Sequence, residues 1–122
     1  MQGQLPPAAQ DIYEEMQELQ AEAEDVVAQR QDAEREREAA AAAIDAIEDS
    51  EGDEAVYRRL GSVFAETTAG EARPALEAKV ARLDDRIEAL ESTEEDLRTE
   101  FENRKEDIKH LLGGAGGIGT SE

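Results

Sequence analysis

The side chains best suited to acid–base chemistry lie near the C-terminal end of the sequence. His110 is the only histidine, and Glu106 and Asp107 precede it by four and three residues. On a helix this spacing puts an imidazole beside a carboxylate, an arrangement that can move a proton. Near the end of a helix, however, a histidine is favourable to the helix dipole when protonated and commonly faces solvent. We interpret His110 as a surface residue and predict that the chain is not an enzyme.

Metal, thiol and nucleotide chemistry lack the residues that they require. One histidine with neighbouring carboxylates falls short of the ligand set of a di-metal helical bundle. No cysteine is present to hold zinc, form a disulfide or act as a nucleophile. The glycine-rich run at 113–119 is not followed by Lys-Ser or Lys-Thr, so it is not a P-loop. We expect no catalytic, metal or cofactor-binding site, and no cofactor.

The charge of the chain restricts its partners. The 122 residues contain 32 acidic and 13 basic side chains, and the formal net charge is -19. Nucleic acid is a poor partner, because phosphate binding needs a basic surface. Repulsion in so acidic a chain is best tolerated where salt screens charges over ~3 Å, as at 1 M, rather than ~10 Å, as at 0.1 M. We expect a salt-rich cytosol.

The sequence also lacks the marks of export or membrane insertion. Its start, MQGQLPPAAQ, has neither a basic nor an apolar signal region, and no long apolar run occurs elsewhere. We therefore expect a cytoplasmic protein with no membrane partner.

Two long segments carry the alternating 4, 3 spacing of a coiled coil, the first from Ile12 to Ile47 and the second from Leu76 to Leu111. A hydrophobic fraction of 39% with 3% aromatic residues cannot fill a thick globular core, which also favours an elongated helical chain. We call the residues with this spacing the heptad positions. The pattern predicts a mainly α protein.

The expected segments follow from these patterns and from the breakers between them. We predict a mobile N-terminal tip at 1–9, helices at 10–50 and 70–112, a linker and hairpin at 51–69 and a flexible glycine-rich tail at 113–122. The start of the second helix stays open. A capping box of Thr68 and Glu71 favours an early start, whereas Gly70 or Pro74 favours a later one.

The segment between the helices, AVYRRLGSVFAETT from Ala55 to Thr68, reads as a β-hairpin with strands at about 55–60 and 63–68. Gly at the first of two loop positions suits a type II′ turn, and pairing Leu60 with Val63 makes every pair sum to 123. Because a lone hairpin is marginal in water and has two unpaired edges, we expect hairpins of several chains to join into an oligomeric β-barrel. The expected interface, the hairpin group, contains Val56, Tyr57, Leu60, Gly61, Val63 and Phe64.

The two heptad patterns are mirror images about this hairpin. Folding the chain there opposes heptad positions whose numbers sum to 123 or 124, and it sets Arg30 against Glu94. Arg37 and Arg104 then lack a facing carboxylate, and we expect their charged ends to reach water. The pattern predicts a long antiparallel two-helix coiled coil.

Apolar residues also gather where both chain ends meet, at the far end of the expected coiled coil. Clustered apolar groups that no core covers indicate a contact site, and Met and flexible ends permit loose contacts. The alternative is that Ile12 and Leu111 only close the last coiled-coil layer. The expected client-binding set, the tip group, contains Leu5, Pro6, Pro7, Ile12, Tyr13, Met16, Leu111 and Leu112.

These features together resemble a known family. The start QGQLPPAAQ, a heptad helix, the run AVYRRLGSVFAE and a second heptad helix resemble the beta-type subunits of archaeal prefoldin over nearly the whole chain. Alpha-type subunits have two hairpins in the connector, whereas residues 48–75 have room for one. The acidic, lysine-poor composition is similar to that of a halophilic archaeal member. The glycine-rich tail is a departure in detail.

The resemblance implies an assembly and a function. It implies a hexamer of two prefoldin alpha and four beta subunits, with a β-barrel platform of hairpins from which the coiled coils extend. It implies an ATP-independent chaperone whose tips hold unfolded client proteins and deliver them to a group II chaperonin. The alternative is a structural coiled-coil scaffold that docks one fixed partner.

Overall fold

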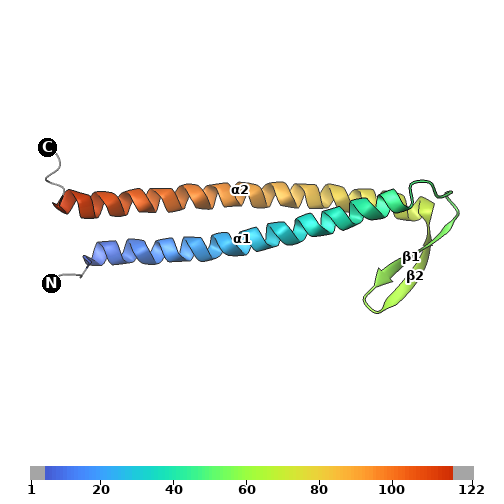
Figure 1. Ribbon diagram of the computed structural model, residues 1–122, viewed down its shortest axis with the longest axis horizontal. Helices are drawn as coiled ribbons and strands as arrows, with labels where there is room; N and C mark the ends of the chain where they lie inside the picture. The colour runs from blue at the N-terminus through green and yellow to red at the C-terminus, as the bar shows by residue number, and fades with distance from the viewer. Residues whose placement is uncertain (1–4, 117–122) are drawn as a thin grey trace. The chain divides into compact units, whose positions relative to one another are not determined.

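The computed structural model describes residues 5–116, with side chains described as far as residue 113. Figure 1 labels its four elements. They are α1 (Pro7–Ala46), β1 (Ala55–Leu60), β2 (Val63–Thr68) and α2 (Ala69–Gly116).

The chain forms two compact units. The terminal unit combines residues up to 29 with residues from 90 onward, and the hairpin unit contains residues 30–89. In each unit a segment of α1 lies beside a segment of α2 that runs in the opposite direction (Figure 1). This arrangement confirms the predicted fold class of two antiparallel helices joined by one β-hairpin.

The heptad positions form the packed surface between the helices. Six of the eight buried residues lie at heptad positions, and each is at most 8% exposed. These six are Val26, Ala33, Ala40, Leu83, Leu97 and Ile108. A fully buried Leu or Ile side chain contributes about 1.5–3 kcal/mol. The helices are therefore held mainly by this narrow apolar strip, because most of the remaining helix surface is polar.

The packed strip continues beyond Ile12, the first heptad position predicted from the sequence. Ala9 lies three residues earlier on α1 and is completely buried. A helix cannot cover its own surface, so the second element of the terminal unit, α2, supplies the cover. This agrees with the extent of the helices, since α1 begins at Pro7 and α2 reaches Gly116. Residues 7–9 and 113–116, expected in the tip and the tail, are helical, and the rest of both segments lies outside the described residues.

The expectation that Arg37 and Arg104 lack facing carboxylates is wrong. In the hairpin unit, Nε of Arg37 pairs with Asp84 on α2. In the terminal unit, Arg104 lies 3.7 Å from Glu15 on α1 and 2.6 Å from Asp107 on its own helix. Both facing acids come from positions that flank the heptad strip, where coiled coils place interhelical ion pairs.

The end of α1 is closed by a side chain from α2. The helix ends at Ala46, before the predicted residue 50, because the next residues form tighter turns. In these turns Glu48 N–H donates to the Asp45 carbonyl at 3.2 Å. Nη2 of Arg73 donates to the Ile47 carbonyl at 2.7 Å. A cation at a helix C-terminus satisfies free carbonyls and interacts favourably with the helix dipole.

The start of α2 is fixed by backbone bonds to the loop before the hairpin. Ala69 N–H donates to the Glu54 carbonyl at 2.9 Å, and Gly70 N–H donates to the Gly52 carbonyl at 2.9 Å. These bonds satisfy N–H groups that a helix start otherwise leaves free. A Cβ added to Gly70 would lie 3.0 Å from the Gly52 oxygen, so this close approach needs glycine.

A threonine cap completes the same helix start. Thr68 Oγ1 accepts from Glu71 N–H at 3.2 Å, which makes Thr68 the N-cap and selects the earlier of the two predicted starts. The Glu71 carboxylate accepts from the Thr67 hydroxyl at 3.0 Å instead of closing a capping box. Pro74 lies inside α2, in its second turn.

The hairpin has the register that the sequence predicts. Leu60 pairs with Val63, Arg59 with Phe64 and Tyr57 with Glu66, and the ladder continues to Ala55 and Thr68. Gly61 has φ of 63°, and no other described residue has a positive φ. A positive φ at the first loop position alone is the mark of the predicted type II′ turn.

This turn predicts a specific cost of substitution. Gly61→Ala should lower the free energy of unfolding by about 1–3 kcal/mol, because alanine is strained at this φ. Gly52→Ala is the matched control, since an added Cβ there meets nothing within 4 Å and its φ is not in the left-handed region. Denaturant unfolding at one fixed salt and protein concentration measures both. Equal stabilities of the two variants would contradict the turn assignment.

Candidate functional site

The hairpin exposes the largest apolar side chains on the described part of the chain. Tyr57 is 65% exposed and Phe64 68%, and Leu60 and Val63 are 45% and 58% exposed. Only one other large apolar residue among the described residues is so open, Tyr13 on α1 at 39%. Exposed apolar side chains that lie together indicate an interaction surface.

The apolar side chains occupy both faces of the hairpin. The register puts Tyr57 and Phe64 at diagonal positions on one face, within reach of each other. Leu60 pairs with Val63 on the other face, next to the turn. Val56 lies on this second face at the opposite end of β1 and is half-buried. One side of the sheet is therefore partly covered near α2, and the turn end is open on both sides.

Both strands of the hairpin are also edge strands. In a two-residue hairpin the residues that flank the turn exchange hydrogen bonds, and bonded and non-bonded pairs alternate along the ladder. The backbone groups of Tyr57 and Arg59 in β1, and of Phe64 and Glu66 in β2, therefore point away from the partner strand. Such edges pair readily with strands of other chains. Apolar cover and free backbone groups thus coincide on this element.

The tip group lies in the terminal unit and is more covered than the hairpin group. Tyr13 is its most exposed large side chain, and Pro6 and Pro7 are exposed. The remaining members are half-buried, namely Leu5, Ile12, Met16, Leu111 and Leu112. The Pro6 carbonyl accepts from Gln10 N–H at 3.0 Å, so the prolines begin α1. The structure brings the set into one unit as a partly open apolar surface.

The terminal unit also has an apolar hollow that the sequence did not reveal. Its volume is about 290 Å³, and Ala23 and Phe101 lie on opposite walls of it. The sequence opposes this small residue to this large one, but how much of the space Phe101 fills depends on side-chain packing. The other lining residues are Leu19, Gln20, Val27, Glu94, Leu97 and Arg98.

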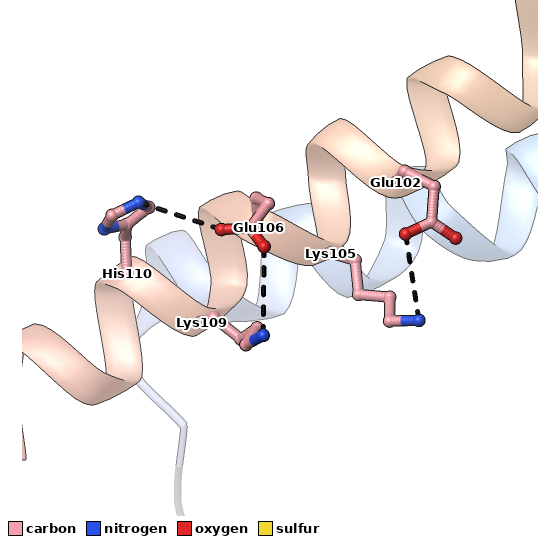
Figure 2. Close-up of polar contacts among 5 residues, drawn as sticks. All are labelled: Glu102, Lys105, Glu106, Lys109 and His110. Atoms are coloured by element: carbon pink, nitrogen blue, oxygen red, sulfur yellow. Dashed lines mark ion pairs between the residues drawn. The ribbon is translucent and has the colours of Figure 1, made fainter.

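The candidate acid–base pair is a surface ion pair. His110 Nε2 lies 3.9 Å from Glu106 Oε1, and its side chain is 83% exposed (Figure 2). Lys109 also reaches Glu106, at 3.8 Å, and Lys105 lies 3.9 Å from Glu102. These contacts join residues three or four apart on one helix, the usual spacing of surface pairs.

Among residues 5–116 no set of three or more histidine, cysteine or acidic residues has the geometry of a metal site. No described helix combines the length and apolar character that a bilayer span needs.

Comparison with known proteins identifies the family. The family model described as prefoldin subunit matches residues 10–115. The chain belongs to the prefoldin family. This is a family of non-enzymatic chaperone subunits. Membership agrees with the prediction that the chain is not an enzyme.

The similar prefoldin chains are all beta subunits, as the sequence resemblance predicts. The chain is 41% identical to prefoldin subunit beta of Halobacterium salinarum over 81 residues, which are 66% of this chain and 65% of that relative. This match therefore spans slightly less than two thirds of the relative. The beta subunit of Methanothrix thermoacetophila is 29% identical over 113 residues, 93% of this chain and 94% of that one.

A solved prefoldin structure has the same fold. The crystal structure of the prefoldin beta subunit from Thermococcus strain KS-1 is similar with a TM-score of 0.79 and 30% identity. The similarity covers 92% of this chain and 97% of that chain. The single hairpin between the two helices is thus shared with a beta-type prefoldin.

The exposed hairpin predicts loss of assembly on charge insertion. Phe64→Glu should weaken association between chains by roughly tenfold or more, because a carboxylate cannot replace an apolar side chain in a buried interface. Sedimentation velocity at high salt measures association, and far-UV circular dichroism should show unchanged helix content. Tyr13→Glu changes an exposed aromatic residue in the terminal unit and should leave association intact. A Phe64→Glu chain that assembles like the parent would rule out the hairpin interface.

Proposed function

We propose that the chain is a subunit of an ATP-independent chaperone that holds unfolded proteins and delivers them to a group II chaperonin. The observation that carries the proposal is the separation of two exposed apolar surfaces in a prefoldin chain. The hairpin group lies in the hairpin unit, and the tip group lies in the terminal unit. One surface is available for assembly while the other is available for a client.

Assembly is the role we assign to the hairpin group. A two-stranded sheet with four large side chains between 45% and 68% exposed is not a finished structure. Strands of neighbouring subunits would cover these side chains and pair the free edges. By resemblance to the family, we propose a hexamer of two alpha and four beta subunits in which the hairpins form a β-barrel.

Client binding is the role we assign to the tip group. Its members are half-buried or modestly exposed, so each offers a small apolar area to an unfolded chain. Small contacts of this kind are individually weak, and several subunits on one platform would bind a client multivalently. Met16 adds an adaptable side chain that tolerates different client surfaces.

The client role predicts a defect that spares assembly. Leu111→Ser with Leu112→Ser should remove most of the protection of an aggregating client, measured by light scattering, because the tip group loses apolar area. Leu76→Ser with Val80→Ser is the matched control, since these α2 residues are equally half-buried but belong to the hairpin unit. Assembly of both variants is checked by sedimentation. Undiminished protection, together with capture of one defined partner, would instead support the fixed-partner scaffold.

The charge of the chain supports work in a salt-rich cytosol. At a net charge of -19 the folded chain repels itself, and salt weakens that repulsion. Raising KCl from about 0.1 M to about 1 M should therefore raise the thermal unfolding midpoint. The triple variant Glu22→Gln, Glu24→Gln and Glu100→Gln removes three exposed carboxylates and should need less salt for the same midpoint. A midpoint that does not depend on salt in either protein would contradict the expectation.

A further inference from the structure

The hairpin differs in charge from the segment that precedes it. Residues 55–68 contain two arginines and one glutamate, whereas residues 47–54 contain five carboxylates and no basic residue. Arg58 and Arg59 are exposed, and neither forms an ion pair with another residue between 5 and 116. The contact described for Arg59 is a 3.1 Å hydrogen bond from Nε to the Gly61 carbonyl. Two cations near the turn are therefore available to another chain.

These arginines cannot reach the acidic segment of their own chain along the strand. Arg58 lies four residues from Glu54, which is about 13 Å in an extended strand. The side chains of Glu54 and Asp53 are exposed, as is the rest of this acidic segment apart from Ile47 and Ser50, which are half-buried. The hairpin thus has a positive turn end and a negative base, separated by the length of β1.

β1 is the more open of the two strands. Five of its six residues are exposed, compared with three of six in β2. On its free edge the backbone groups of Ala55, Tyr57 and Arg59 point away from β2. An added strand would find three residues in a row with unpaired donors and acceptors.

We infer that β1 pairs antiparallel with β1 of a second copy of the chain, with Tyr57 opposite Tyr57 at a two-fold axis. The inference rests on the proposed role of the hairpin in assembly. In this register Ala55 faces Arg59 of the second copy on both sides of the axis, so all three outward residues of each strand are paired. A shift by two residues in either direction loses one of these pairs.

The charges select the same arrangement. The register sets Arg58 diagonal to Glu54 of the second copy on one face and Arg59 diagonal to Asp53 of the second copy on the other. Diagonal neighbours are about 7–8 Å apart at the backbone, within reach of long side chains. A parallel pairing would set each arginine directly against itself, which is destabilising. The equivalent pairing of two β2 edges centred on Glu66 would oppose two carboxylates.

Two single charge reversals test this pairing. Arg58→Glu opposes glutamate to Glu54 across the dimer, and Glu54→Arg opposes arginine to Arg58. Each variant alone should self-associate at least roughly tenfold more weakly than the parent, because two symmetric attractions become repulsions. Mixed together, the two variants carry opposite charges at both contacts, so they should form a heterodimer of near-parental affinity.

Full-length chains are measured by sedimentation equilibrium, with one variant carrying a mass tag, at the lowest KCl concentration that preserves the helical circular dichroism signal. Arg82→Glu is the control, since it makes the same charge change at an exposed α2 residue and should leave association unchanged. Heterodimer recovery in the mixture supports the inference and excludes an effect within one chain.

Three results would overturn the inference: a monomeric parent, a single variant that associates like the parent, or a mixture that fails to associate. None of these results touches the proposed chaperone role, because client protection is measured on the complex with an alpha-type partner. If protection fails while heterodimer recovery holds, the proposed function is wrong and the β1 pairing stands.

Discussion

The structure depends on the burial of one narrow apolar strip between two antiparallel helices. Most of the surface of α1 and α2 is charged or polar, and the heptad positions supply nearly all of the buried apolar side chains. Long helices in water are stabilised mainly by packing of an apolar face. Because the strip is made of alanines on α1 at Ala33 and Ala40 and of larger residues such as Leu83 on α2, the two backbones can lie close together.

The reversal of the chain is secured by backbone groups at the junction of loop, hairpin and helix. Arg73 closes the end of α1, while carbonyls of Glu54 and Gly52 satisfy the start of α2. Polar groups that would otherwise be free at two helix ends are thus paired with each other's neighbourhood. The hairpin projects from this fixed junction with its large side chains exposed, which explains how one small chain can be well ordered in its helices and still incomplete in its sheet.

Much of this architecture is readable from the sequence because it follows from periodicity and turn chemistry. The heptad spacing locates the buried residues, and Gly61 fixes both the turn type and the register of the strands. The partners of Arg37 and Arg104 were missed because they flank the heptad strip, where the spacing of apolar residues carries no information. Gly113 to Gly116 suggested a tail, yet the last turn of α2 continues because a facing surface near Ala9 is there to cover.

The candidate site was predictable in its residues but not in its relative exposure. Tyr57 and Phe64 stand out as aromatic residues beside a turn, whereas the half-burial of Val56 on the same hairpin depends on the angle at which the hairpin leaves α2. The hollow beside Ala23 and Phe101 depends on how far one ring fills the space opposite a methyl group. Such packing details lie beyond sequence periodicity.

The antiparallel pairing has a consequence for the order in which the protein is made. During synthesis α1 leaves the ribosome first, but the partner of its earliest turns is the last part of α2 to be translated. The hairpin unit joins residues that are near in sequence and can close early, whereas the terminal unit must wait for a complete chain. A nascent subunit therefore carries an uncovered apolar strip of its own until translation ends, and is for that time in the same condition as the clients proposed for the finished protein.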